Sequence, residues 1–233
     1  MNLKQAAAAE ALNDVRSGMT LGLGTGSTAE ELTKLLGEAL HGRRLRDVRC
    51  TCTSRRTEDL ARSLGIPLFS LGELAPLDLA IDGADEIDPQ LRLIKGRGGA
   101  LLREKIVEQA ARRFVVIADE SKLVDRLGKG VLPVEVTPFA LAVLQRRFAD
   151  LLPVLREGVT TDEGHVILDV RVPPGEDIAE TVAHIRAHAG VVETGFFPTE
   201  ATEAVIAGTG GVRRLRRAGG SPAGPPAASP AEG

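Results

Sequence analysis

Apolar positions in the first part of the chain form two alternating kinds of segment. Short apolar runs, typical of buried strands, occupy residues 20–24, 48–53, 77–82 and 114–119. The segments around them have the composition or the three-to-four-residue apolar spacing of helices. These predicted helices cover residues 2–17, 29–40, 55–64 and 100–112. Strands that alternate with helices predict an α/β fold with a doubly wound, Rossmann-like and mostly parallel sheet.

The order of elements changes near residue 130. From there the pattern predicts strand, helix, strand, strand, helix and strand, the βαββαβ order of a ferredoxin-like α+β domain. The apolar run at 203–209 is expected to return to the main sheet. We therefore predict a Rossmann-like domain formed by residues 1–129 with 203–217, and a smaller domain at 130–202. The tail, 218–233, consists mainly of Ala, Gly, Pro and Ser and is predicted to be disordered.

The composition of the chain argues against several classes of protein. The chain has 233 residues, of which 43% are apolar, and its 29 Lys and Arg against 32 Asp and Glu give a net charge of −3. It contains no uninterrupted apolar run of roughly 18 residues, so a membrane protein is not expected. An isoelectric point near 5.9 and 3% aromatic residues argue against nucleic acid as a partner. Cys50 and Cys52 are expected to be free thiols on one face of a strand, and a cytoplasmic location follows.

The first candidate for chemistry is a glycine-rich turn, GLGTGST, at residues 22–28. It lies between a predicted strand and a predicted helix, where free backbone N–H groups and the helix dipole favour an anion. The hydroxyl groups of Thr25, Ser27 and Thr28 would add donors. The turn does not match the dinucleotide or P-loop pattern. Any strand-to-helix turn also favours glycine and a Ser or Thr cap, so the structural explanation remains open at this point.

The second candidate is the acidic segment IDGADEID at residues 81–88, which follows an apolar strand. Ligands of open α/β sheets bind at the carboxyl ends of strands, and Asp82 and Asp85 flank two small residues there. Glu86 and Asp88 are expected to face water. The carboxylate spacing is not typical of a metal site, and we predict none. A solvated acidic turn is the alternative.

The third candidate is KGRGGALLREKI at residues 95–106. Its glycines can form a nest of backbone amides beside the charge of Lys95. Glu104 falls in the first turns of a helix, where the dipole favours the ionised form that a general base requires. Glu104 can equally have only a helix-supporting role. Lys122, after the strand that ends at residue 119, is a weaker candidate.

The segments GLGTGSTA, IDGADEID, KGRGGALLREKI, ADESKLVDRLG and LPVEVTPFA occur in an order and spacing that resemble ribose-5-phosphate isomerase of the A type. The resemblance covers residues 3–212. It implies interconversion of D-ribose 5-phosphate and D-ribulose 5-phosphate through an enediolate, in the non-oxidative pentose phosphate pathway. It also implies an enzyme without a cofactor that forms a homodimer or homotetramer.

The resemblance also implies roles for individual residues. Glu104 matches the family's catalytic base, and Lys95 with the neighbouring glycine amides would stabilise the developing oxyanion. Asp82 and Asp85 match aspartates that assist ring opening and hold hydroxyl groups. The family often has glycine where this chain has Arg97. Substrate contacts are expected from Lys4, Thr25, Gly26, Ser27, Thr28, Gly83, Ala84, Gly96, Arg97, Gly98 and Lys122, with Lys4, Ser27 and Thr28 near the phosphate.

Two other classes of function compete with this interpretation. A non-catalytic sugar-phosphate sensor would keep the glycine-rich turn and dispense with a base. An acyl-CoA transferase of related architecture would use a glutamate as nucleophile. The combination of Glu104 and Lys95 favours the isomerase.

Overall fold

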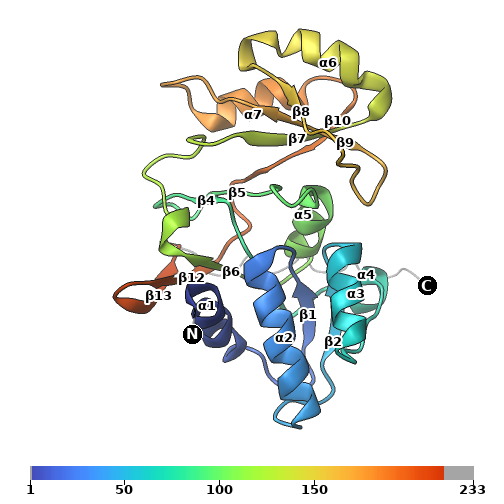
Figure 1. Ribbon diagram of the computed structural model, residues 1–233, viewed down its shortest axis with the longest axis vertical. Helices are drawn as coiled ribbons and strands as arrows, with labels where there is room; N and C mark the ends of the chain where they lie inside the picture. The colour runs from blue at the N-terminus through green and yellow to red at the C-terminus, as the bar shows by residue number, and fades with distance from the viewer. Residues whose placement is uncertain (1, 218–233) are drawn as a thin grey trace, which may run out of the picture.

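The computed structural model describes residues 2–217, and a six-stranded sheet forms its lower half in Figure 1. The strand order is β13-β12-β6-β3-β1-β2. Neighbouring strands run parallel except β13, which pairs antiparallel with β12 at the edge. The strands are β1 (Thr20–Leu23), β2 (Arg49–Cys52), β3 (Leu79–Asp82), β6 (Phe114–Asp119), β12 (Glu203–Gly208) and β13 (Gly211–Arg216). The predicted mostly parallel sheet is confirmed, and β12 returns to it as expected.

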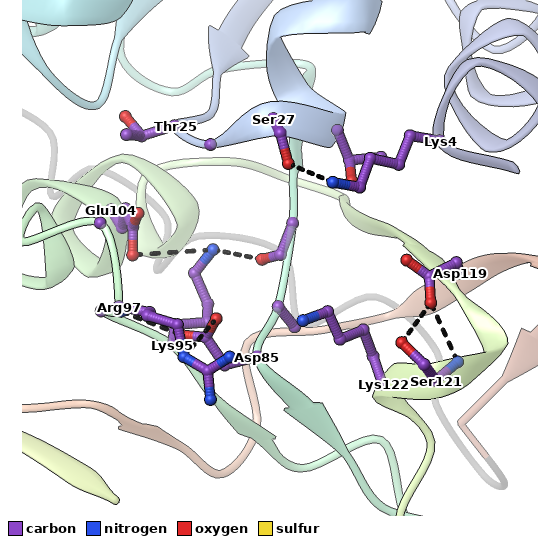
Figure 2. A pocket seen from close by; sticks show the side chains of 16 residues that line it. Lys4, Thr25, Ser27, Asp85, Lys95, Arg97, Glu104, Asp119, Ser121 and Lys122 are labelled. Carbon is purple, nitrogen blue, oxygen red and sulfur yellow. Dashed lines mark hydrogen bonds and ion pairs between the residues drawn. The ribbon is translucent and has the colours of Figure 1, made fainter. Parts of the chain in front are cut away.

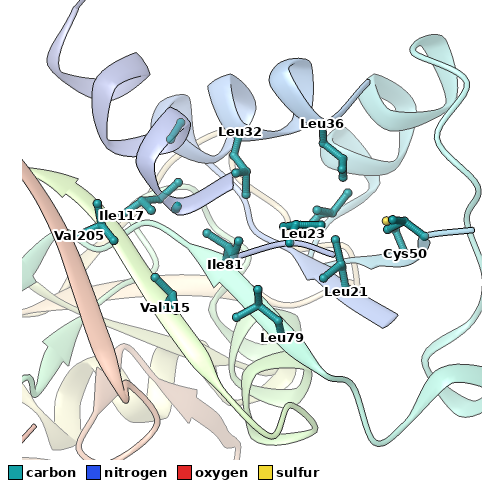
Figure 3. Close-up of a cluster of buried hydrophobic side chains, with 14 of the residues drawn as sticks. Leu21, Leu23, Leu32, Leu36, Cys50, Leu79, Ile81, Val115, Ile117 and Val205 are labelled. Atoms are coloured by element: carbon teal, nitrogen blue, oxygen red, sulfur yellow. The ribbon is translucent and has the colours of Figure 1, made fainter. Parts of the chain in front are cut away.

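One face of this sheet packs against helices from the first third of the chain. Because side chains alternate along a strand, Leu21, Leu23, Leu79 and Ile81 all point to the same face. There they meet the apolar sides of α1 and α2, as Figure 3 shows for Leu32 and Leu36 of α2. The helices on this side are α1 (Leu3–Leu12), α2 (Ser27–His41) and α3 (Arg55–Ser63).

The other face carries the alternate residues of the same strands. Phe114 and Val116 of β6 pack with Phe197, which belongs to a separate three-stranded sheet. Val107 of α5 and Leu77 form a further apolar cluster on this side. The elements here are α4 (Leu71–Leu74), α5 (Leu101–Gln109), β4 (Glu86–Ile87), β5 (Leu93–Ile94) and β11 (Phe196–Phe197).

A four-stranded antiparallel sheet, at the top of Figure 1, has the order β10-β7-β9-β8. Numbered along the chain this is fourth, first, third and second, which is the ferredoxin-like arrangement that the βαββαβ pattern predicted. Its elements are β7 (Leu132–Val136), α6 (Leu141–Arg147), β8 (Val154–Leu155), β9 (Val166–Val170), α7 (Ile178–Arg186) and β10 (Val191–Thr194). Short 3-10 helices occupy η1 (Glu120–Lys122), η2 (Pro138–Ala140) and η3 (Ala149–Leu151).

Some features differ from the sequence prediction. The first helix ends at Leu12 and not near residue 17, and Asp14 beyond it accepts hydrogen bonds from Arg113 and Arg214. The two-residue strands β4 and β5 were not predicted. The run at 190–197, predicted as the last strand of the βαββαβ pattern, is divided between β10 and β11, which belong to different sheets. Both cysteines are buried free thiols, as expected. Within residues 2–217 no helix is long and apolar enough to span a membrane, and the predicted disordered tail lies outside the described residues.

Candidate active site

Three adjacent parallel strands, β1, β3 and β6, bring the candidate segments together. Their carboxyl ends lead into the glycine-rich turn, the acidic segment and η1. A cavity of about 490 Å³ lies where these segments meet (Figure 2). It is lined by Lys4, Thr25, Gly26, Ser27, Thr28, Gly83, Ala84, Asp85, Lys95, Gly96, Arg97, Gly98, Glu104, Asp119, Ser121 and Lys122. Every predicted site residue except Asp82 is in this lining.

A buried cluster of charges forms one side of the cavity. Lys95 Nζ lies 2.9 Å from Asp82 Oδ2, 3.1 Å from Glu108 Oε1 and 3.7 Å from Glu104 Oε2. It also donates to Gly83 O at 2.5 Å. All four charged residues are at most 3% exposed. Within residues 2–217, Gly83 O is the one hydrogen-bond acceptor of the ammonium, and the three carboxylates face it as ion pairs. The facing oxygens Asp82 Oδ2, Glu104 Oε2 and Glu108 Oε1 have no hydrogen-bond partner among these residues.

The cluster contains more negative than positive groups, and this controls its protonation. Burial raises the pKa of Glu104 to about 8, although the charge of Lys95 acts in the opposite direction. Burial also raises the pKa of Asp82 and, strongly, that of Glu108. Burial lowers the pKa of Lys95, but the three carboxylates outweigh burial and raise this pKa above the ordinary value. The sequence predicted that the helix dipole favours ionised Glu104, but burial raises its pKa above the ordinary value.

Asp82 differs from Glu104 and Glu108, the other two carboxylates around Lys95, because its side chain accepts hydrogen bonds from backbone N–H groups. Its Oδ1 accepts from the N–H groups of Thr25 at 2.9 Å and Gly83 at 2.6 Å. A Cβ atom on Gly24 would lie 2.1 Å from Asp82 Cγ, so only glycine permits this close approach. Asp82 is therefore fixed behind the cavity wall, against Lys95, while Asp85 lines the cavity itself.

Two hydroxyl groups of the glycine-rich turn, those of Thr25 and Ser27, have different partners. Thr25 Oγ1 donates to Ser54 Oγ at 2.7 Å and lies 2.7 Å from Thr53 Oγ1, so this hydroxyl is engaged with residues at the end of β2. Ser27 Oγ accepts from Lys4 Nζ at 2.8 Å. Ser27 begins α2, and its hydroxyl thus lies at a helix N-terminus beside a cation.

The opposite side of the cavity is more open and contains Lys4, Lys122, Asp119 and Ser121 (Figure 2). Asp119 accepts from the backbone N–H of Ser121 at 3.0 Å and from its hydroxyl. Burial raises the pKa of Asp119, but these hydrogen bonds and the charges of Lys122 and Lys4 lower it overall. Two cations and one carboxylate leave a positive excess here, which suits an anionic group.

Arg97 lies at the cavity mouth, with its side chain 63% exposed. Its backbone N–H donates to Asp85 Oδ2 at 2.9 Å, and its Nε lies 3.8 Å from Asp85 Oδ1. Arg97 therefore places a cation beside Asp85.

Several residues at or near the cavity were not predicted from the sequence. Glu108 follows Glu104 by one helical turn, and this i,i+4 spacing is a signal that could have revealed it. Asp119 and Ser121 adjoin the predicted Lys122. Glu86 and Asp88 do not face water: Glu86 accepts from Gly128 and Gly130, and Asp88 pairs with Arg92. Within residues 2–217 no group of three or more His, Cys, Asp or Glu could hold a metal ion.

Residues 49–211 match the family model of ribose 5-phosphate isomerase A (phosphoriboisomerase A). The chain belongs to the ribose 5-phosphate isomerase A family. Ribose-5-phosphate isomerase A from Rhodopseudomonas palustris (strain BisB5) is 48% identical over 93% of this chain and 98% of the relative. The protein of the same name from Roseiflexus sp. (strain RS-1) is 51% identical over 91% of this chain and 94% of the relative. The family resemblance of the sequence motifs is thereby confirmed.

Solved structures of the family have the same fold. A D-ribose-5-phosphate isomerase in complex with phospho-erythronic acid has a TM-score of 0.88 and 39% identity, and covers 93% of this chain and 100% of its own. The ribose 5-phosphate isomerase A of Methanocaldococcus jannaschii has a TM-score of 0.86 and 40% identity, with coverage of 91% and 97%. Family membership and fold thus agree.

Proposed function

We propose that this chain interconverts D-ribose 5-phosphate and D-ribulose 5-phosphate through an enediolate, with Glu104 as the base. The observation that carries the proposal is the cavity itself. It places Glu104, whose buried Oε2 has no hydrogen-bond partner among residues 2–217, 3.7 Å from the buried ammonium of Lys95, and it has an open, positively charged side. Family membership supplies the substrate class.

The reaction moves the carbonyl group from C1 to C2 of the open-chain sugar. Ionised Glu104 takes the proton from C2, and the electron pair of the C–H bond forms the enediolate while negative charge develops on O1. A proton then moves from O2 to O1, which shifts the negative charge to O2. Return of the carbon-bound proton from Glu104 to C1 gives the ketose, so one carboxylate serves as base and then as acid. No external oxidant or reductant is needed, because hydrogen and electrons stay within the sugar.

Lys95 and the neighbouring glycine N–H groups, those of Gly96 and Gly98, would stabilise the negative oxygen, since the N–H of Arg97 is donated to Asp85. Donors fixed before the reaction stabilise a developing charge well, because they need not reorganise. Asp82 acts through Lys95, whose position it holds. Asp85, which lines the cavity, is the better placed of the two aspartates to contact the sugar hydroxyl groups and assist ring opening. Lys4, Ser27, Thr28 and Lys122 would bind the phosphate.

The test is conversion of ribose 5-phosphate by the purified protein with a chelator present. Glu104→Gln should lower kcat/KM by about 10²–10⁴-fold, because the amide cannot accept the proton. Glu180→Gln is the matched control, since Glu180 lies in the first turn of α7 as Glu104 does in α5. Full activity of Glu104→Gln would remove Glu104 from this role. Sugar-phosphate binding by the wild type without conversion would indicate a sensor.

The same assay has a pH dependence that tests the base. Since Glu104 must be ionised, kcat/KM should rise with pH to a plateau, with a midpoint near the pKa of about 8. A profile that is flat between pH 6 and 9 would contradict a base in this environment.

Three broader features belong to the same proposal. We propose that the enzyme is cytoplasmic, that neither nucleic acid nor membrane is a partner, and that it forms a homodimer or homotetramer. The two-domain division at residues 130–202 is supported by an apolar cluster formed mainly by the four-stranded sheet and its helices, to which Ile94, Leu127 and Phe196 also contribute. Light scattering after size-exclusion chromatography would measure the oligomeric state, and a monomer at micromolar concentration would contradict it.

A further inference from the structure

The loop between β8 and β9 connects the four-stranded sheet to the cavity. In Figure 1 it extends from that sheet toward α5. Arg103 of α5 donates to Glu163 of this loop at 2.6 Å, and Arg55 N donates to Asp162 at 2.8 Å. A Cβ atom on Gly99 would lie 3.2 Å from Val159 Cγ1. The loop therefore lies close against the glycine segment that lines the cavity.

Arg156, at the start of this connection, makes the most specific contact. Its Nη1 donates to Gly96 O at 2.7 Å and to Arg97 O at 3.1 Å. Its Nε donates to Asp169 Oδ2 at 2.9 Å, and Nη2 bonds to the other oxygen of Asp169. Its side chain is only 16% exposed. The planar guanidinium is thus held by Asp169 on one side and holds two backbone carbonyl groups on the other.

These two carbonyl contacts determine where the adjacent N–H groups point. In a planar trans peptide, the C=O of one residue and the N–H of the next point in opposite directions. Because Gly96 O faces Arg156, the N–H of Arg97 faces away from Arg156, and it donates to Asp85 of the cavity. Because Arg97 O faces Arg156, the N–H of Gly98 is also directed away. Gly98 lines the cavity, and its N–H has no protein acceptor among residues 2–217.

Without such a contact the segment would be free to rotate. Its glycines have wide backbone freedom, and Gly96 already adopts φ +103°. Among residues 2–217, the other backbone hydrogen bonds of residues 95–99 are Lys95 N to Gly195 O at 2.9 Å, Arg97 N to Asp85 Oδ2 at 2.9 Å and Gly99 N to Gly96 O at 3.0 Å, and none of them involves the Arg97–Gly98 peptide. Arg156 supplies the missing constraint on that peptide.

We propose that Arg156 is a positioning residue for catalysis, which orients the peptides of residues 96–98 so that the Gly98 N–H faces the negative oxygen of the enediolate. This inference rests on the proposed isomerase function. Arg156 does not line the cavity and does not contact substrate. Its effect is on the transition state, because a donor that is fixed in advance matters most when charge develops.

The test compares Arg156→Lys with the wild type. A lysine keeps the positive charge but cannot bond Asp169 and two carbonyl groups with one planar fork. We expect kcat to fall by about 10–100-fold, because small displacements of catalytic groups have effects of this size. KM should change by less than about threefold, since the phosphate contacts are unaffected. Arg186→Lys, which alters an arginine paired with Glu193 away from the loop, should match the wild type.

A binding measurement separates positioning from a general structural effect. Phospho-erythronic acid has a carboxylate where the substrate forms its enediolate, so its affinity should fall about as much as kcat does in Arg156→Lys. Inorganic phosphate should bind with unchanged affinity. In Arg156→Ala, added guanidinium ion at millimolar concentration should restore part of the lost kcat.

Several outcomes would overturn the proposal. These are an unchanged kcat in a folded Arg156→Lys variant, a rise in KM alone, or equal losses of affinity for phosphate and for phospho-erythronic acid. An inactive wild type would refute the proposed function together with this inference. An active wild type with an unaffected Arg156→Lys variant would refute the role of Arg156 alone.

Discussion

Two buried lysines lie near the same aromatic ring and have different roles. Lys95 Nζ is 5.6 Å from the centroid of Phe197, and Lys105 Nζ is 4.5 Å from it. The two lysines are 2% and 4% exposed. Lys105 donates to Glu193 and to the carbonyl oxygens of Thr194 and Phe196, so it joins α5 to the strands β10 and β11. Lys95 has three carboxylates around it.

Because their partners differ, the pKa values of the two lysines are shifted in opposite directions. Burial lowers the pKa of Lys105, and the carboxylates of Glu193 and Glu200 do not compensate for it. Burial also lowers the pKa of Lys95, but the charges of Asp82, Glu104 and Glu108 together raise it above the ordinary value. Burial alone therefore does not identify a functional charge. An excess of buried charge that the fold does not neutralise is the more specific sign of an active site.

Among the predicted changes, replacement of either lysine by methionine should have the largest effect on stability. Removing one member of a buried ion pair costs about 3–5 kcal/mol, because it leaves a charge unpaired. We expect both variants to lose about this much stability in urea unfolding at pH 8. Lys105→Met should keep most of its activity per folded molecule, whereas Lys95→Met should lose it.

The Lys95→Met variant should also be less destabilised at pH 5 than at pH 8, because its three carboxylates can then remain protonated. Equal residual activity in the two variants would show that the comparison between a structural and a functional lysine is wrong.

The second-largest effect is expected from the buried carboxyl groups, which make the free energy of unfolding depend on pH. A carboxyl group with a raised folded-state pKa stabilises the protein fully below its unfolded-state pKa. This contribution is lost as the pH rises toward the folded-state value. For Glu104 the window runs from about pH 4.5 to about 8, and Glu108 acts in the same direction. Glu108→Gln should therefore gain stability relative to the wild type as the pH rises from 5 to 9.

This prediction is measured as the difference between two urea unfolding series across that pH range. Glu203→Gln provides the contrast, because arginine partners outweigh burial and lower the pKa of Glu203. Parallel pH curves for Glu108→Gln and the wild type would show that Glu108 has no shifted titration.

The smallest effect is expected on the open side of the cavity. Lys4→Gln removes one cation from the region of Ser27, where solvent screens the interaction. KM for ribose 5-phosphate should rise by about two- to fivefold, with kcat nearly unchanged. The difference from wild type should shrink in 0.5 M salt. Lys34→Gln, at an exposed lysine paired with Glu31, is the control. A large fall in kcat for Lys4→Gln would place Lys4 among the groups that act in the transition state.

The local sequence determined much of this protein. Apolar runs and helical spacing were enough to predict the parallel sheet, the βαββαβ order and the segments that follow β1, β3 and β6. The physical reason is that strand and helix periods are local properties, and the ends of parallel strands meet at one edge. The motifs therefore indicated both the site and the family.

Only the tertiary structure decided the electrostatics of the site. The i,i+4 spacing links Glu108 to Glu104, but only the folded chain shows that Glu108 meets Lys95. Arg156 is 60 residues from Gly96, so its role could not be assigned from its neighbours in the chain. The sign of the pKa shift at Glu104 was also predicted wrongly, because a helix terminus is visible in the sequence and burial is not. Burial and through-space charge depend on which segments pack together, and the folded chain alone sets that arrangement.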